Sequence, residues 1–123
     1  MYLSFDEIVE IHSQQISRYG GESGFLNRGN LDFIADMQDR FTDPLEIAAF
    51  LLYNIATLHP FCDGNKRTAY VAAGIILCES GFDFLVSEEE EERFVLSVAN
   101  CNENFESVTQ WLKKMTEKRE FTY

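Results

Sequence analysis

Basic residues are scarce in this chain. Of its 123 residues, 10 are Lys or Arg and 21 are Asp or Glu, which gives a formal net charge of -11. A protein that binds nucleic acid or an anionic membrane surface needs positive charge to displace the counterions of the phosphates. The composition therefore argues against direct nucleic-acid binding and against membrane binding.

Cysteines and long apolar runs are also few. Cys62, Cys78 and Cys101 are odd in number, widely spaced and form no CxxC pair. This pattern argues against a disulfide framework and a Cys-rich zinc site. No apolar run reaches the ~18 residues of a membrane span, and the N-terminus lacks the segments of a signal peptide. We therefore expect a cytoplasmic protein with reduced thiols.

Apolar residues, in contrast, are plentiful. Hydrophobic residues make up 46% of the chain and aromatic residues 14%. A chain of this length can bury a core without disulfides or metal, and no linker or repeat divides it. We expect a single domain over residues 1–123.

Helical spacing of the apolar residues runs along most of the sequence. It predicts helices over about 5–19, 31–41, 45–58, 65–80, 88–99 and 104–118. Residues 82–86 alternate weakly between apolar and polar, which indicates a short strand or hairpin there. The expected fold class is all-α, a bundle of about six helices.

Capping residues mark the starts of several of these helices. Residues 4–7 read Ser-Phe-Asp-Glu, the S-x-x-E form of a capping box. Asp43 and Pro44 supply a cap and a proline for the first helical position. Asn30 and Ser87 are expected to cap the second and fifth helices.

The turn between the third and fourth helices holds the densest group of polar residues. Residues 59–68 read His-Pro-Phe-Cys-Asp-Gly-Asn-Lys-Arg-Thr, and Lys66 and Arg67 are the only basic residues from position 41 to 92. Both belong to the first turn of the fourth helix, where the macrodipole already places about half a positive charge. Two cations there repel the helix end, and a bound anion would reverse this effect.

The residue types in this turn fit phosphate chemistry. Helix N-termini offer free N–H groups to phosphate, Gly64 lets the backbone approach closely, and Arg67 can donate bidentate hydrogen bonds. Asp63 is a hard ligand for Mg²⁺, which prefers one or two carboxylates plus substrate phosphates. His59 can accept a proton near neutral pH. The set predicts phosphoryl or nucleotidyl transfer to a hydroxyl.

Residues 59–67 resemble the signature of the Fic/Doc family, in particular the Doc branch, the death-on-curing toxins of toxin–antitoxin modules. The resemblance extends to Arg18-Tyr19-Gly20-Gly21 after the first helix, to the length of the chain and to the helical layout. It implies a Fic/Doc-like bundle as the fold.

Residue roles follow from the resemblance. His59 would deprotonate the target hydroxyl, Asp63 would hold Mg²⁺, and Phe61 would anchor the loop in the core. The residues that would bind the nucleotide phosphates are Gly64, Asn65, Lys66 and Arg67.

Lys66 bears on the type of transfer. Family members with Gly at this position transfer AMP from ATP, whereas Doc-like members with Lys act as kinases and place the γ-phosphate where the others place the α-phosphate. AMP-transferring relatives usually have a second arginine where this chain has Tyr70. The resemblance therefore implies a Mg-ATP-dependent protein kinase, with a Fic-type AMP transferase as the alternative.

The resemblance also implies partners. Some relatives carry an inhibitory helix with the pattern Ser/Thr-x-x-x-Glu-Gly/Asn, but here Thr116 to Glu120 is followed by Phe121. Inhibition would then come from a small antitoxin protein whose C-terminal segment folds into a groove. The protein substrate implied is elongation factor Tu, modified on a threonine to block translation.

Other interpretations stay open. The chain can be a catalytically silent nucleotide- or protein-binding module, or an enzyme that hydrolyses phosphates. Residues 18–21 can be a simple helix C-cap, and His12 a structural residue of the first helix. Cys62 is most simply a bystander thiol, and residues 88–92 a solvated first turn or an antitoxin-docking surface.

Overall fold

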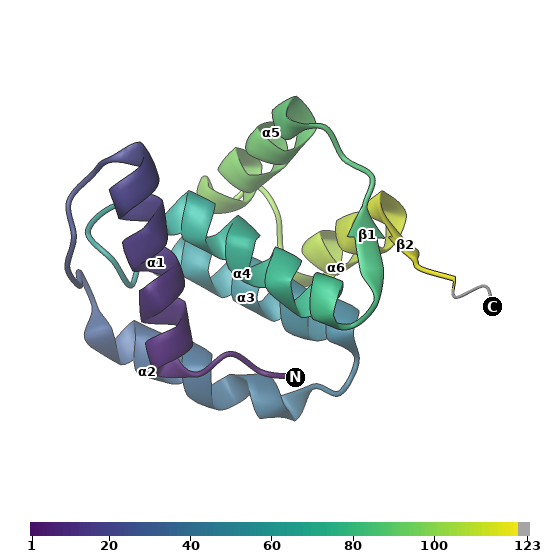
Figure 1. Ribbon diagram of the computed structural model, residues 1–123. Coiled ribbons are helices and arrows are strands. Elements are labelled where there is room, and N and C mark those ends of the chain that lie inside the picture. The colour runs from purple at the N-terminus through teal and green to yellow at the C-terminus, as the bar shows by residue number, and fades with distance from the viewer. Residues whose placement is uncertain (121–123) are drawn as a thin grey trace.

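Six α-helices form most of the computed structural model, which describes residues 1–120 (Figure 1). The helices are α1 (Phe5–Tyr19), α2 (Arg28–Asp36), α3 (Pro44–Leu58), α4 (Asn65–Glu79), α5 (Glu88–Ala99) and α6 (Phe105–Met115). The remaining elements are a 3-10 helix, η1 (Met37–Arg40), and two strands, β1 (Phe82–Phe84) and β2 (Thr116–Lys118). The predicted all-α bundle with one short strand is confirmed.

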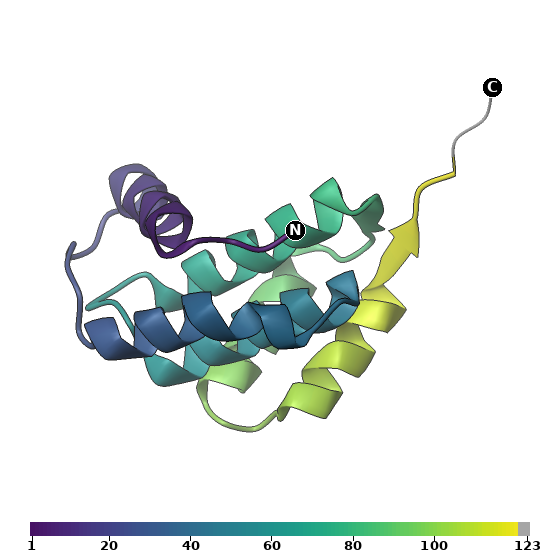
Figure 2. The same ribbon diagram turned by 90° about the horizontal axis from the view of Figure 1, so that it is seen from below.

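Helix α3 lies at the centre of the bundle. Eight of its residues are buried, on all sides of the helix. It packs most extensively against α4, whose Ala69, Ala72 and Ala73 are fully buried and let the two helices approach closely. Figure 2 shows α1 on one side of this pair and α6 on the other. The turn that joins α3 to α4 therefore starts and ends on the most extensively packed pair of helices.

Three of the four predicted caps are present. The Ser4 hydroxyl accepts the Glu7 N–H at 3.1 Å, and the Glu7 carboxylate accepts the Ser4 N–H at 3.0 Å, which completes the capping box of α1. The Asp43 side chain caps α3, with Pro44 in the first turn. Ser87 caps α5. These caps rest on contacts between near neighbours, which the sequence alone specifies.

The prediction for α2 is wrong at both ends. Asn27, not Asn30, is the N-cap, because the Asn30 side chain instead donates to the Leu58 carbonyl at 2.7 Å and satisfies the end of α3. The α-helix stops at Asp36 and continues as η1. There the buried Gln38 amide donates to the carbonyls of Ile34 and Ala35 at 3.2 and 3.3 Å, which occupies acceptors at the helix end.

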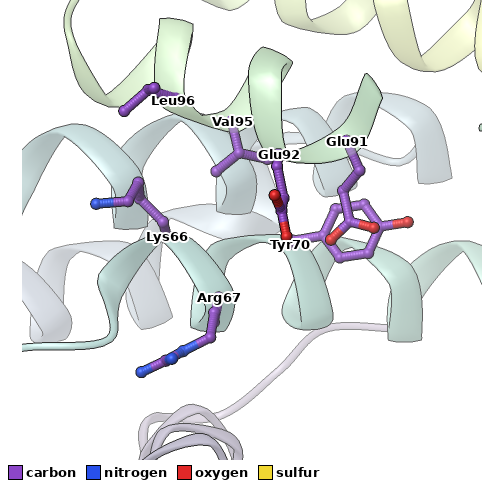
Figure 3. A pocket seen from close by; sticks show the side chains of 7 residues that line it. All are labelled: Lys66, Arg67, Tyr70, Glu91, Glu92, Val95 and Leu96. Atoms are coloured by element: carbon purple, nitrogen blue, oxygen red, sulfur yellow. The ribbon is translucent and has the colours of Figure 1, made fainter. Parts of the chain in front are cut away.

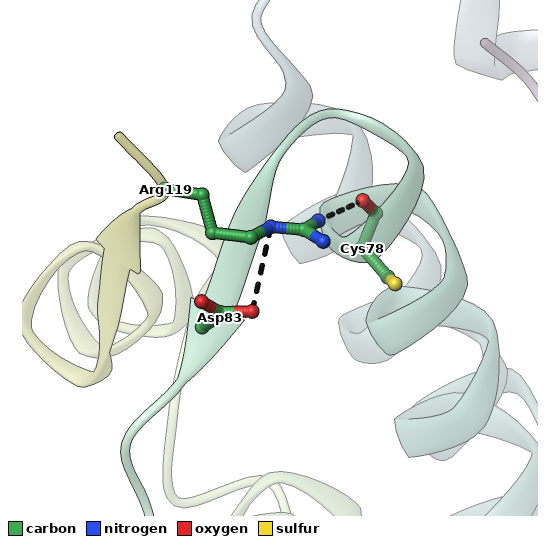
Figure 4. Close-up of polar contacts among 3 residues, drawn as sticks. All are labelled: Cys78, Asp83 and Arg119. Atoms are coloured by element: carbon green, nitrogen blue, oxygen red, sulfur yellow. Dashed lines mark hydrogen bonds and ion pairs between the residues drawn. The ribbon is translucent and has the colours of Figure 1, made fainter. Parts of the chain in front are cut away.

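The last helix ends three residues earlier than predicted. Residues 116–118 are extended and form β2, which pairs antiparallel with β1, Asp83 opposite Glu117. The Arg119 side chain reinforces this end by an ion pair with Asp83 at 3.5 Å and a hydrogen bond to the Cys78 carbonyl (Figure 4). Pairing with a distant strand thus overrides the helical pattern. No helix within residues 1–120 is long and apolar enough to cross a membrane.

Candidate active site

His59 ends α3 in an unusual backbone conformation. Its φ and ψ are 44° and 61°, the left-handed region, and Cys101 is the only other non-glycine residue of the described chain with positive φ. Such a conformation costs roughly 1–2 kcal/mol, and Pro60 disfavours the right-handed alternative. The turn holds it in place and leaves the imidazole exposed.

Phe61 fastens the turn to the helices behind it. Its side chain is 1% exposed and stacks on the His12 ring, with ring centroids 3.7 Å apart and planes 4° apart. Its backbone forms an isolated bridge with Phe25 in the loop after α1. The turn is therefore held by a buried aromatic ring and by hydrogen bonds to a second loop.

Asn65 shapes the turn from inside. Its Oδ1 accepts the Phe61 N–H at 3.1 Å and its Nδ2 donates to the Phe61 carbonyl at 2.9 Å. The side-chain amide is thus occupied by the backbone of the turn. Its backbone N–H, at the first position of α4, belongs to the helix end that can face a ligand.

The N-terminus of α4 is open to an anion. Gly64, at φ 75°, is the N-cap and provides no side-chain cap. A Cβ atom here would lie 3.2 Å from the Ile16 side chain and 3.6 Å from the His12 ring, so glycine fits both the conformation and the space. No acidic residue lies in the first turn. The helix end therefore retains its positive field and its free N–H groups.

The Asp63 carboxylate lies beside this helix end. Its Oδ1 accepts the Gly64 N–H at 2.9 Å and its Oδ2 accepts the Glu22 N–H at 3.3 Å. A Cβ on Gly21 would come within 2.7 Å of Oδ2. The loop after α1 thus positions the carboxylate as closely as the turn itself does.

Arg67 connects the turn to the end of α1. Its Nη2 donates to the Gly20 carbonyl at 3.1 Å, and its guanidinium lies over the Tyr19 ring, 5.0 Å from the centroid. Lys66 is exposed. Residues 18–21 therefore do more than cap a helix, although Gly20 does cap it through its N–H bond to the Ile16 carbonyl.

A cavity adjoins these two cations. It has a volume of about 310 Å³ and lies between α4 and α5 (Figure 3). Its lining residues are Lys66, Arg67, Tyr70, Glu91, Glu92, Val95 and Leu96. A smaller hollow of about 200 Å³ lies directly over residues 63–67. The two hollows share Lys66 and Arg67, so a ligand with an anionic end and a larger body can span both.

Tyr70 and Glu91 face one another in the larger cavity (Figure 3). Burial, followed by the Glu91 charge, raises the pKa of the Tyr70 hydroxyl well above its usual range. Burial also raises the pKa of the Glu91 carboxyl, its approach to the Tyr70 hydroxyl opposes this, and the charges of Glu88 and Glu92 raise the pKa further. Tyr70 is therefore a neutral hydrogen-bond donor throughout the physiological range.

The sequence did not predict the α5 wall of this cavity or the stacking of His12 on Phe61. Residues 88–92 carry only a run of glutamates, and nothing local distinguishes Glu91 from its neighbours. Tyr70 gave a weak signal, because it lies one helical turn after Lys66 and Arg67 and on the same face.

Metal binding by this site would depend on a bound ligand. Residues 1–120 contain no group of three or more His, Cys, Asp or Glu residues that could hold a metal ion. Asp63 is the one carboxylate of residues 59–68. A single carboxylate beside a phosphate pocket fits Mg²⁺, which keeps several waters and takes its other ligands from substrate phosphates.

Several known proteins are similar to this chain in sequence. Residues 2–77 match the model of the Fic/DOC family. The chain is 35% identical over 94 residues to the protein kinase doc of Escherichia phage P1, with 72% of this chain and 75% of the relative covered. It is 37% identical over 76 residues to the protein adenylyltransferase fic-1 of Caenorhabditis elegans, over 59% of this chain but only 15% of that protein.

The fold is similar to a solved structure as well. The match to Fic-1 from C. elegans has a TM-score of 0.71, covers 93% of this chain and 40% of that one, and has 24% sequence identity. At this identity the likeness concerns the fold. The relatives named above differ in the reaction that their names state, one being a kinase and the other an adenylyltransferase.

Proposed function

Because the chain belongs to the Fic/DOC family, we propose that it is a Doc-type kinase that transfers the γ-phosphoryl group of Mg-ATP to a protein hydroxyl. One observation carries the proposal: the uncapped N-terminus of α4 bears two cations, next to an exposed imidazole and a carboxylate. That combination serves phosphate binding and proton transfer together.

Phosphate oxygens would lie in the hollow over residues 63–67. The free N–H groups of α4 and the charges of Lys66 and Arg67 would neutralise them. The hydrogen bond to Gly20 and the Tyr19 ring hold the Arg67 guanidinium before any ligand arrives. Such preorganisation lets a site stabilise developing charge without rearranging during the reaction.

Asp63 would hold Mg²⁺ together with the phosphate oxygens. Bound there, the ion supplies charge neutralisation for the transferring group. The carboxylate is fixed on one side by Gly64 and on the other by Glu22. These two hydrogen bonds fix the position of Asp63, the only carboxylate in the turn.

His59 would act as the general base. It would accept the proton of the acceptor hydroxyl, whose oxygen forms a bond to the γ-phosphorus while the bond to the β-γ bridging oxygen breaks and ADP leaves. An exposed imidazole at the end of a rigid helix can reach a protein acceptor. The left-handed conformation keeps the side chain clear of the core.

The body of the nucleotide would occupy the cavity between α4 and α5. Its volume of about 310 Å³ falls within the range of small-molecule sites, and its wall joins apolar, aromatic and acidic groups. The ring of Tyr70 offers a stacking face, and the Glu91 and Glu92 carboxylates can accept hydrogen bonds from a sugar or a base. The arrangement supports a nucleotide in preference to inorganic phosphate.

Two considerations favour a kinase over an AMP transferase. Lys66 stands where AMP-transferring members have Gly. The kinase relative is matched over 75% of its length, whereas the adenylyltransferase is matched over 15%. The identity with that adenylyltransferase keeps AMP transfer as the second candidate, and a catalytically silent binding module as the third.

The acceptor and inhibitor follow from the Doc resemblance. We place the target hydroxyl on a threonine of elongation factor Tu, and we expect an antitoxin to bind a surface groove. Expression of the chain without that antitoxin should then arrest growth. The same expression of the His59→Ala variant should not.

Labelled ATP tests the proposal directly. The protein is incubated with γ-labelled or α-labelled ATP and either purified elongation factor Tu or a ribosome-free lysate. Label from the γ-position should appear on a protein band, and His59→Ala should abolish it. Label from the α-position would overturn the kinase assignment in favour of AMP transfer. Nucleotide turnover without a labelled protein would indicate a hydrolase.

A further inference from the structure

His12 lies on α1, outside the motif, yet it contacts the turn at two points. Its ring is 4% exposed and stacks on Phe61 at 3.7 Å. Its Nε2 lies 2.8 Å from the backbone carbonyl oxygen of Asp63. The polar partner of Nε2 is thus the residue that the proposed function assigns to the metal.

The partner atom fixes the state of the ring. A carbonyl oxygen only accepts hydrogen bonds, so Nε2 of His12 carries the hydrogen. The bond therefore depends on a donor at that position and not on the charge of the imidazole.

Planarity of the peptide bond carries the effect of this hydrogen bond to the ligand side. The Asp63 carbonyl and the Gly64 N–H belong to one trans peptide and point in opposite directions. A donor that holds the carbonyl toward α1 therefore directs the N–H away from α1, where the Asp63 carboxylate now accepts it at 2.9 Å.

Packing prevents the peptide from turning over. A Cβ atom on Gly64 would meet Ile16 at 3.2 Å and the His12 ring at 3.6 Å, so α1 lies directly against this part of the backbone. The left-handed Gly64 conformation is thus supported on one side by α1 and on the other by the start of α4.

We propose that His12 is a positioning residue, whose Nε2 hydrogen bond orients the Asp63–Gly64 peptide so that the Gly64 N–H holds the Asp63 carboxylate in place for the metal that accompanies the nucleotide phosphate. This inference rests on the proposed function for the identity of the ligand. The orientation of the peptide itself does not depend on it.

Two substitutions separate the hydrogen bond from the packing. His12→Phe keeps an aromatic ring against Phe61 and removes the donor. His12→Gln removes the ring and keeps an N–H donor at about the reach of Nε2. If His12 is purely structural, His12→Gln should weaken the protein more than His12→Phe does. If His12 is a positioning residue, His12→Phe should weaken ligand binding more than His12→Gln does.

The experiment measures Mg-ADP binding by calorimetry, exchange of the Gly64 amide hydrogen by NMR, and the melting temperature of each variant. We expect His12→Phe to weaken binding about tenfold, the effect of losing one hydrogen bond of ~1.4 kcal/mol, and to speed Gly64 exchange. His12→Gln should bind within about threefold of wild type even if it melts earlier.

Unchanged binding and unchanged Gly64 exchange in His12→Phe would overturn the inference. If that variant does not fold, His12→Gln decides alone, because a loss of binding in it would contradict a role for the donor. Failure of the wild-type protein to bind Mg-ADP would overturn the proposed function, and Gly64 exchange would still test the role of His12.

Discussion

The side chain of Arg67 donates a hydrogen bond of 3.1 Å to the backbone carbonyl of Gly20, 47 residues earlier in the chain. The bond joins the first turn of α4 to the end of α1, and Tyr19 packs on the same guanidinium. Two short segments that are far apart in the sequence thus lie together at the N-terminus of α4. The guanidinium is oriented by a backbone carbonyl, which leaves its charge free for a ligand.

Arg67→Lys is expected to raise KM for ATP about tenfold or more. Lysine retains the charge but lacks the planar fork that can bind Gly20 and a phosphate together, and hydrogen bonds to charged groups contribute ~1.5–3 kcal/mol. Initial rates of phosphoryl transfer at varied ATP concentration measure the effect. Lys113→Ala on α6 removes a cation far from the turn and should leave KM unchanged. An Arg67→Lys enzyme with wild-type KM would show that the fork is not used.

Gly21→Ala should displace the Asp63 carboxylate. The added methyl group would lie 2.7 Å from Asp63 Oδ2, closer than real Cβ contacts come. We expect metal affinity, measured by Mn²⁺ titration in the presence of ADP, to fall by about tenfold or more, within the loss typical when groups that orient a metal ligand are removed.

Gly24→Ala is the matched control for that substitution. Gly24 has φ +114° against +117° for Gly21, but nothing lies within 4 Å of its Cβ position. Both variants therefore place an alanine at nearly the same positive φ, which costs roughly 1–2 kcal/mol. Equal losses of metal affinity in the two would show that strain, and not contact with Asp63, is responsible.

Glu91→Gln should alter how stability depends on pH. Burial raises the pKa of Glu91 in the folded protein, so the folded state binds its proton more tightly than the unfolded state does. Stability is then lost as pH rises from the ordinary pKa of the carboxyl through the raised one. The variant lacks this loss, so its melting temperature relative to wild type should increase across that window.

Glu89→Gln controls for the change of net charge, because Glu89 is exposed on the same helix and is not among the causes of the Glu91 shift. Melting curves from acid to neutral pH compare the three proteins. A wild-type minus Glu91→Gln difference that does not vary with pH would contradict the burial of Glu91 against Tyr70.

Gln38→Leu is expected to destabilise the fold by about 2–4 kcal/mol. The Gln38 amide is fully buried. Its oxygen accepts the Leu3 N–H at 2.8 Å, and its nitrogen donates to the Leu3 carbonyl at 2.7 Å. Leucine would leave that N–H and carbonyl buried without partners. Urea unfolding measures the change, and Gln14→Leu, on the exposed side of α1, should stay within about 0.5 kcal/mol of wild type. A neutral Gln38→Leu would mean that other groups replace these bonds.

Local signals account for what the sequence predicted well. The capping box at residues 4–7 and the Asp43-Pro44 start of α3 act between near neighbours. The predicted cap at Asn30 was wrong because the sequence does not distinguish Asn30 from Asn27 as a capping residue. Only the fold shows that the Asn30 side chain donates to the Leu58 carbonyl. β2 was missed because Thr116 follows a helical pattern until β1, from a distant part of the chain, pairs with it.

The residues of the candidate site also fall into a local group and a group from distant parts of the chain. Residues 59–67 are consecutive in one turn, so their chemistry was visible in the sequence. His12, Gly21 and Glu91 reach the site from α1, the following loop and α5. Only the packing of the helices brings these residues to the site, and no spacing pattern in the sequence predicts this.

The most direct test of the central claim is the mass of the acceptor protein after reaction with unlabelled Mg-ATP. Tandem mass spectrometry of elongation factor Tu, or of the labelled lysate protein, should find one hydroxyl residue heavier by a phosphoryl group. The product should be absent when His59→Ala replaces the wild-type protein. An increment of AMP on that residue, or an unmodified acceptor in a mixture where ATP has been consumed, would contradict the account.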